Sequence, residues 1–155
     1  MAAFVFRMPF GNGADDVSLG FNSANGNYEI RDTTTQFLLA SKIAANNVNE
    51  VLVFGNEEVD VLRIAPSFLN MPLQVLFNGD RGDSDKIVTQ ADTNQTLITN
   101  RLTIGECPPI ILVGVEAAQL TGGAGNNVID ASEFSVKIGS IFGSVTLDGG
   151  VAMII

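Results

Sequence analysis

The stretch that decides the fold runs from Gly122 to Asp130 and reads Gly-Gly-Ala-Gly-Asn-Asn-Val-Ile-Asp, followed by Ala131-Ser132-Glu133-Phe134. Glycine tolerates the positive φ angles that tight turns need, and the apolar residues Val128 and Ile129 begin an extended segment. The stretch therefore predicts a glycine turn that leads into a β-strand. The segment 144–150, Ser-Val-Thr-Leu-Asp-Gly-Gly, looks like the start of another such unit.

Short apolar runs recur along the rest of the chain, and turns rich in glycine, asparagine and acidic residues separate them. The runs predicted as strands cover residues 2–8, 51–54, 59–62, 73–77, 87–88, 96–98 and 110–113. Only Thr33 to Ala45 has apolar residues at roughly helical spacing.

A shift of 66 residues aligns one half of the chain with the other without a gap, and Ala65-Pro66-Ser67-Phe68 then falls on Ala131-Ser132-Glu133-Phe134. Thr33 to Ala45 falls on a segment that contains Pro108 and Pro109, which a helix interior does not tolerate. We therefore expect both segments to be extended or irregular, with a short helix only if the two halves diverged there. The alignment predicts a single β domain over residues 1–155, made of two degenerate repeats at approximately 11–76 and 77–147, with uncapped terminal strands.

The glycine stretch resembles the G-G-x-G-x-D-x-U-x repeat of the hemolysin-type (RTX-like) glycine- and aspartate-rich family of bacterial extracellular surface proteins. Gly122, Gly123, Gly125 and Ile129 stand at their pattern positions, whereas Asn127 occupies the aspartate position. The resemblance is best from Gly114 to Phe134 and weak in the first half. It implies an extracellular or cell-surface location, and it implies Ca²⁺ bound between stacked turns.

The strand and turn pattern predicts an all-β fold, and specifically a parallel β-solenoid or β-roll-like stack of short strands. An antiparallel β-sandwich is the alternative, because strands of the same length suit it. The glycines assigned to structural turns are Gly11, Gly55, Gly79, Gly122, Gly123, Gly125 and Gly149.

Ca²⁺ is the candidate cofactor, because it prefers carboxylate and carbonyl oxygens. The candidate ligands are the acidic and amide side chains of the turns: Asp80, Asp83, Asp85, Asp16, Asp60, Asn127 and Asp148. Among these, Asp80, Asp83 and Asp85 form the best candidate calcium site. The competing interpretation is that these carboxylates are simply solvated.

The composition excludes several classes of function. A net charge of −9, with eight basic residues, argues against nucleic-acid binding. The chain has no histidine, which excludes Ser-His-Asp and Cys-His catalysis, and its single Cys107 has no disulfide partner. No apolar run is long enough to span a membrane, and Met1 to Phe10 does not have the order of a signal peptide.

We expect a non-enzymatic extracellular structural or adhesive repeat domain that partners other copies or flanking repeats through its ends. The apolar terminal residues predicted to mediate self-association into filaments are Phe4, Val5, Phe6, Met153, Ile154 and Ile155. The alternative is a polysaccharide-binding or polysaccharide-acting β-solenoid. With no tryptophan and one tyrosine, the usual aromatic platform for sugars is nearly absent.

Overall fold

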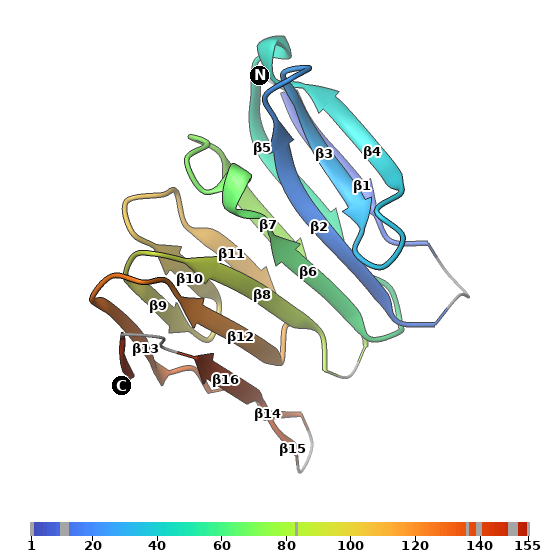
Figure 1. Cartoon of the computed structure of the whole chain (residues 1–155). Coiled ribbons are helices and arrows are strands. Elements are labelled where there is room, and N and C mark those ends of the chain that lie inside the picture. Colours follow the sequence, from blue (N-terminus) through green and yellow to red (C-terminus); the bar gives the residue numbers. More distant parts are fainter. Residues whose placement is uncertain are drawn as a thin grey trace.

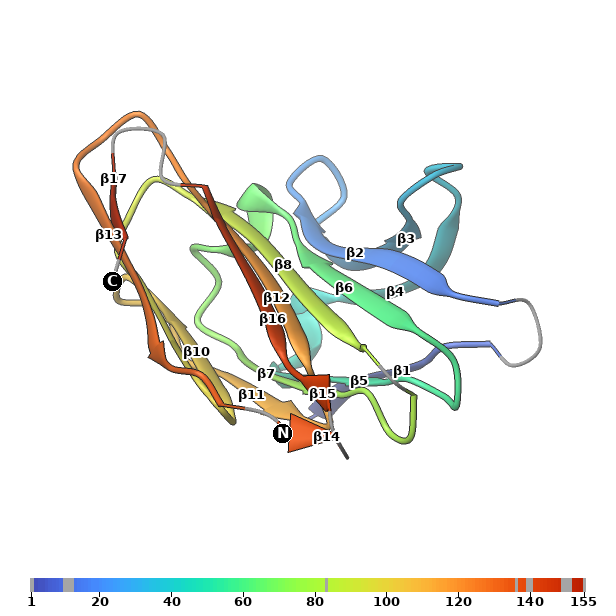
Figure 2. The same ribbon diagram turned by 90° about the horizontal axis from the view of Figure 1, so that it is seen from below.

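The computed structural model describes residues 2–9, 13–82, 84–135, 137–138, 141–148 and 152–154. The chain forms two large mixed sheets that face each other across the core (Figures 1 and 2). Sheet A has the spatial order β1 (Ala2–Arg7), β5 (Val48–Phe54), β7 (Gln74–Asn78), β11 (Ile110–Val113), β10 (Arg101–Ile104), β9 (Gln95–Ile98), β13 (Asn127–Glu133) and β17 (Ala152–Ile154).

Sheet B has the order β16 (Ser144–Asp148), β12 (Ala117–Gly122), β8 (Lys86–Ala91), β6 (Asp60–Ile64), β2 (Asp15–Asn22), β3 (Asn27–Asp32) and β4 (Leu38–Ile43). The pair β14 (Lys137–Ile138) and β15 (Ile141–Phe142) stands apart from both large sheets. The 3₁₀ turns η1 (Ala44–Asn46) and η2 (Pro66–Phe68) are the only helical segments among the described residues.

The all-β prediction is confirmed, but the predicted solenoid is wrong. From β5 to β9 the chain changes sheet at every connection, so β5 pairs in parallel with β7, and β6 with β8. Two antiparallel segments interrupt this pattern, β2–β3–β4 in sheet B and β9–β10–β11 in sheet A. The result is a two-layer arrangement, as in the sandwich alternative, with parallel and antiparallel pairs in each sheet.

The core lies between the sheets because alternate residues of each strand point inward. Val51 and Val53 on β5 are fully buried, as are Leu62 on β6 and Phe77 on β7. Burial of one such side chain contributes roughly 1.5–3 kcal/mol. The apolar runs of the sequence therefore hold the two layers together.

The segment Thr33 to Ala45, expected to be extended or irregular, contains no α-helix. Asp32 to Gln36 form a turn, Leu38–Ile43 form β4, and Ala44–Asn46 add one 3₁₀ turn. Its counterpart in the repeat alignment contains β10 and the start of β11. The 66-residue shift, however, places β5 of sheet A on β12 of sheet B, so aligned strands lie in different layers.

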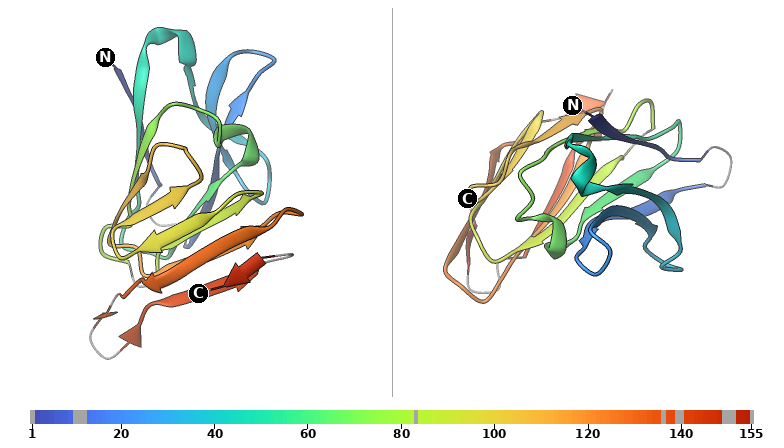
Figure 3. Two further views of the ribbon diagram at one scale, coloured as in Figure 1. Left: turned by 90° about the vertical axis from the view of Figure 1, so that its left-hand side faces the viewer. Right: turned by 90° about the horizontal axis from the view of Figure 1, so that it is seen from above.

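Each sheet has one edge strand at either end of the molecule (Figures 1 and 3). β1 and β4 are the edge strands at one end, and β17 and β16 are those at the other. Within the part of the chain that is described, no helix is long and apolar enough to cross a bilayer.

Candidate functional site

A row of acidic residues, which we call the acidic column, crosses sheet B where its strands begin. The column consists of Asp15, Asp60, Asp85 and Glu116, each at or next to the first residue of β2, β6, β8 and β12. Asp15 pairs with Asp60 in register, and Val61 pairs with Lys86, so Asp85 lies beside Asp60. The register between parallel strands thus places residues that are far apart in the sequence side by side.

Backbone amides bind the carboxylates of the acidic column from one strand to the next. The Asp60 N–H donates to Asp85 Oδ1 at 2.8 Å, and the Asp85 N–H donates to Glu116 Oε2 at 3.0 Å. The Asn56 N–H donates to Asp60 Oδ2 at 2.6 Å. Asp85 and Glu116 therefore each bind the amide at the start of the neighbouring strand, and Asp60 binds the amide of the turn before its own strand.

Two oxygens of the acidic column are buried and have no hydrogen-bond partner among the described residues. They are Asp60 Oδ1 and Asp85 Oδ2, and both residues are 0% exposed. Burial, together with the charges of Glu116, Asp60 and Asp80, raises the pKa of Asp85 to about 7. Burial also raises the pKa of Asp60, aided by the charges of Asp15 and Glu58. A carboxyl group that cannot be solvated retains its proton to higher pH.

Glycine backbone packs directly against the acidic column. A Cβ atom on Gly55 would collide with Asp60 Oδ2, and one on Gly79 would collide with Asp85 Oδ2 and the Gly114 carbonyl oxygen. Neither Gly55 nor Gly79 has a positive φ. These glycines are required for close approach rather than for a left-handed turn.

The Gly122–Asn127 turn lies at the opposite end of the strands and packs against Asp92 in the β8–β9 turn. Asp92 Oδ1 accepts hydrogen bonds from the Gly125 N–H at 2.7 Å and from Asn127 Nδ2 at 2.8 Å. The amide of Asn127, which stands at the family's aspartate position, is a donor here. These bonds, that from Asn127 first, lower the pKa of Asp92.

The remaining calcium candidates are dispersed. Asp16 forms a bidentate ion pair with Arg63, Asp80 lies in an exposed turn, and Asp148 ends β16. Asp83 lies outside the described residues. Among the residues described, no three acidic, histidine or cysteine side chains converge on a metal position. Calcium binding by this chain stays a prediction.

The predicted turn glycines and terminal residues also have definite positions. Gly122 ends β12, and Gly123 presses on Asp92 as Gly125 does. Phe4 is buried, Phe6 packs partly against the core, and Val5 is 50% exposed. Met153 and Ile154 belong to β17, of which only the backbone is described, whereas Gly11, Gly149 and Ile155 lie outside the described residues.

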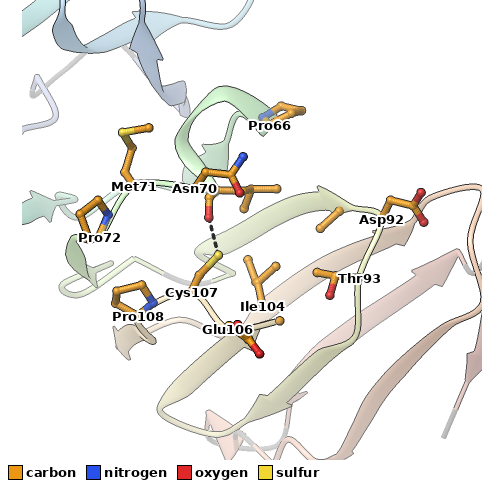
Figure 4. A pocket seen from close by; sticks show the side chains of 13 residues that line it. Pro66, Asn70, Met71, Pro72, Asp92, Thr93, Ile104, Glu106, Cys107 and Pro108 are labelled. Carbon is orange, nitrogen blue, oxygen red and sulfur yellow. Dashed lines mark hydrogen bonds between the residues drawn. The ribbon is translucent and has the colours of Figure 1, made fainter.

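An open cleft of about 590 Å³ lies near the same end of the strands as Asp92 (Figure 4). Its lining comes from the loop after η2, the β8–β9 turn and the β10–β11 loop. The Cys107 thiol donates a hydrogen bond to the Leu69 carbonyl oxygen, and burial raises its pKa. A thiol that keeps its proton is a poor nucleophile. Asp92 and Glu106 are the charged residues among the described lining.

Sequence reasoning missed Glu116, Asn56 and Asp92. Asn56 is 0% exposed, and its Nδ2 donates to the Pro9 carbonyl oxygen at 2.9 Å. A glycine followed within a few residues by an acidic side chain recurs before or at the start of β6, β8 and β12, but this local pattern does not indicate that the carboxylates meet. No protein-family model, curated protein or solved structure matches the chain in the comparisons with known proteins.

Proposed function

We propose that the chain is a non-enzymatic structural domain of an extracellular or cell-surface protein that associates with other copies through the open edges of its sheets. The observation that carries this proposal is that both sheets are open, with an edge strand at either end. In sheet A, β1 and β17 run in the same direction, because two antiparallel steps at β10 separate two sets of parallel strands.

The two edge strands of sheet B also run in the same direction. β2, β6, β8, β12 and β16 are parallel, and the two reversals at β3 and β4 return β4 to their direction. Because neither sheet closes on itself, each has an edge at either end whose main-chain N–H and C=O groups can pair with a strand of another molecule.

The internal polar groups support a structural role. Asp60 and Asp85, the most deeply buried acidic side chains among the described residues, bind backbone amides and lie outside the cleft. The cleft has no aromatic ring and no Lys or Arg among its described lining residues, so it offers no stacking platform for a sugar.

Sedimentation velocity over a wide range of concentration tests the proposal, in EDTA and again in millimolar calcium. We expect the average mass to rise with concentration. A monomer at every concentration in both buffers would exclude association of this chain. Identical profiles in the two buffers would contradict the predicted role of calcium but leave association through the edges intact.

A further inference from the structure

The exposed apolar side chains of the molecule are concentrated at one end. Seven large apolar side chains are exposed among the described residues, and four of them, Phe37, Leu38, Leu39 and Ile43, lie in or next to β4. We call these four residues the β4 patch. A fifth, Val5, lies on β1, the edge strand of the other sheet at the same end (Figure 1). Contiguous exposed apolar residues on an edge strand mark an interaction surface.

The turn before β4 holds Phe37 in place. The Thr35 N–H donates to Asp32 Oδ1 at 2.6 Å, and the Gln36 N–H donates to the Asp32 carbonyl oxygen at 2.9 Å. The Asp32 N–H donates in turn to the Phe37 carbonyl oxygen at 3.0 Å, and Arg31 Nη1 binds the Gln36 carbonyl oxygen at 3.0 Å. Phe37 is nevertheless 70% exposed. An aromatic side chain on a fixed backbone loses little entropy when a partner covers it, which is typical of an interface anchor.

The opposite edge of sheet B has a different character. On β16, Val145 and Leu147 pack against the core, and the alternating residues Ser144, Thr146 and Asp148 are exposed. A head-to-tail contact in this sheet would therefore set an apolar row against a polar row. Contact between two copies of β4 would instead set apolar against apolar.

We infer that two copies of this chain associate by a two-fold contact between their β4 strands, with the β4 patch of each copy covering that of the other. The inference rests on the proposed function and names its partner and symmetry. A two-fold axis makes the two β4 strands antiparallel, and an antiparallel pair satisfies the free main-chain groups of both edges.

The sequence of β4 suits this symmetry. An axis beside Ser41 sets Leu39 of one copy opposite Ile43 of its partner, so that exposed apolar residues of the same sheet face meet. The same axis keeps the two Lys42 side chains from facing each other. Because the contact uses the same surface on both copies, it closes at a dimer and leaves the β16 edge of each copy outward.

The first test is sedimentation velocity of Ile43→Lys, with Thr146→Lys as its matched control on the other edge of sheet B. Both positions are exposed, and both substitutions place a lysine on an edge strand. We expect the wild type and Thr146→Lys to reach a dimer and no larger species. We expect Ile43→Lys to weaken the dimer by about tenfold or more. Thermal melts of both variants establish that they remain folded.

The second test is a cross-link near the axis, made with Ser41→Cys in a Cys107→Ala background. Two-fold pairing brings the two new thiols close together, so mild oxidation should convert the protein to a covalent dimer. If the protein associates but the Ser41→Cys thiols fail to cross-link on oxidation, the two-fold contact is overturned. Loss of association in Thr146→Lys would overturn it as well. Either result would leave end-to-end association standing. A wild type that is monomeric at all concentrations would overturn both.

Discussion

The acidic column and the Gly122–Asn127 turn are built alike, since in both a glycine backbone is pressed against an acidic side chain. In the column that side chain follows in the same connection, whereas Asp92 comes from the neighbouring β8–β9 turn. Their carboxyl groups are nevertheless held in opposite states. Asp85 is sealed from solvent and has a raised pKa of about 7, whereas Asp92 accepts two short hydrogen bonds and has a lowered pKa. Enclosure, rather than the glycine–acid pattern itself, therefore decides whether such a turn carries charge.

The largest expected effect on stability comes from a glycine-to-alanine substitution in the acidic column, with the same substitution in the Gly122–Asn127 turn for comparison. In Gly79→Ala the new Cβ meets Asp85 and the Gly114 carbonyl oxygen, neither of which can move away, so we expect a loss of about 3 kcal/mol in the free energy of unfolding. In Gly125→Ala the Cβ meets only the far end of the Asp92 side chain, and the loss should be much smaller. Urea denaturation measures both, and equal losses would contradict the distinction.

The pH dependence of stability should follow the enclosed group. Folded Asp85 retains its proton up to a pKa of about 7, whereas in the unfolded chain it loses it near the ordinary value of 3.8. The folded state thus binds more protons between these values, so the free energy of unfolding should fall as the pH rises from 5 to 7, by at most about 1.4 kcal/mol per pH unit. The chain has no histidine to compete in this window. A flat or rising profile, measured by urea denaturation at each pH, would contradict a protonated Asp85.

Asp85→Asn assigns that slope to one residue. The amide keeps the size of the carboxyl group but cannot ionise, so we expect the stability of the variant to be nearly constant between pH 5 and pH 8. Asp92→Asn is the control, because the pKa of Asp92 is lowered and lies outside this window. If the slope persists in Asp85→Asn, another group of the column, such as Asp60, must supply it.

Asn127→Asp restores the residue that the resembling family carries at this position. The substitution replaces the amide that donates to Asp92 with a second carboxylate, so we expect a lower Tm in EDTA because the two charges repel. Calcium should raise the Tm of this variant more than that of the wild type, because two carboxylates can share a cation. An equal response of both proteins would show that the turn has no calcium-binding geometry.

The strand content of the fold was readable from the sequence, but the assignment of strands to sheets was not. Asn25-Gly26, with Gly26 at a φ of +69°, is a hairpin signal. It produces the β2–β3 reversal that the solenoid prediction omitted. Gly105, with a φ of +51°, similarly turns the chain between β10 and β11. The glycine-containing turns therefore indicated the antiparallel reversals that the solenoid prediction lacked.

The acidic column could not have been predicted from local sequence. Asp60 and Asp85 are 25 residues apart, and Asp85 and Glu116 are 31 apart. They meet only because β6, β8 and β12 share a parallel register. The Asp92–Asn127 contact likewise joins residues 35 positions apart. A side chain's protonation state depends on such long-range contacts, so the turn motif alone does not predict a metal site.

The β9–β10–β11 meander has a consequence for how such a chain can change in length. β9 and β11 run in the same direction, and they pair with β13 and β7 on their outer sides. A pair of added strands thus returns the chain to its starting direction, and every other strand keeps its orientation. Sheet A can grow or shrink by whole hairpins at this position, which makes the meander a natural place for evolution or a designer to graft a new segment.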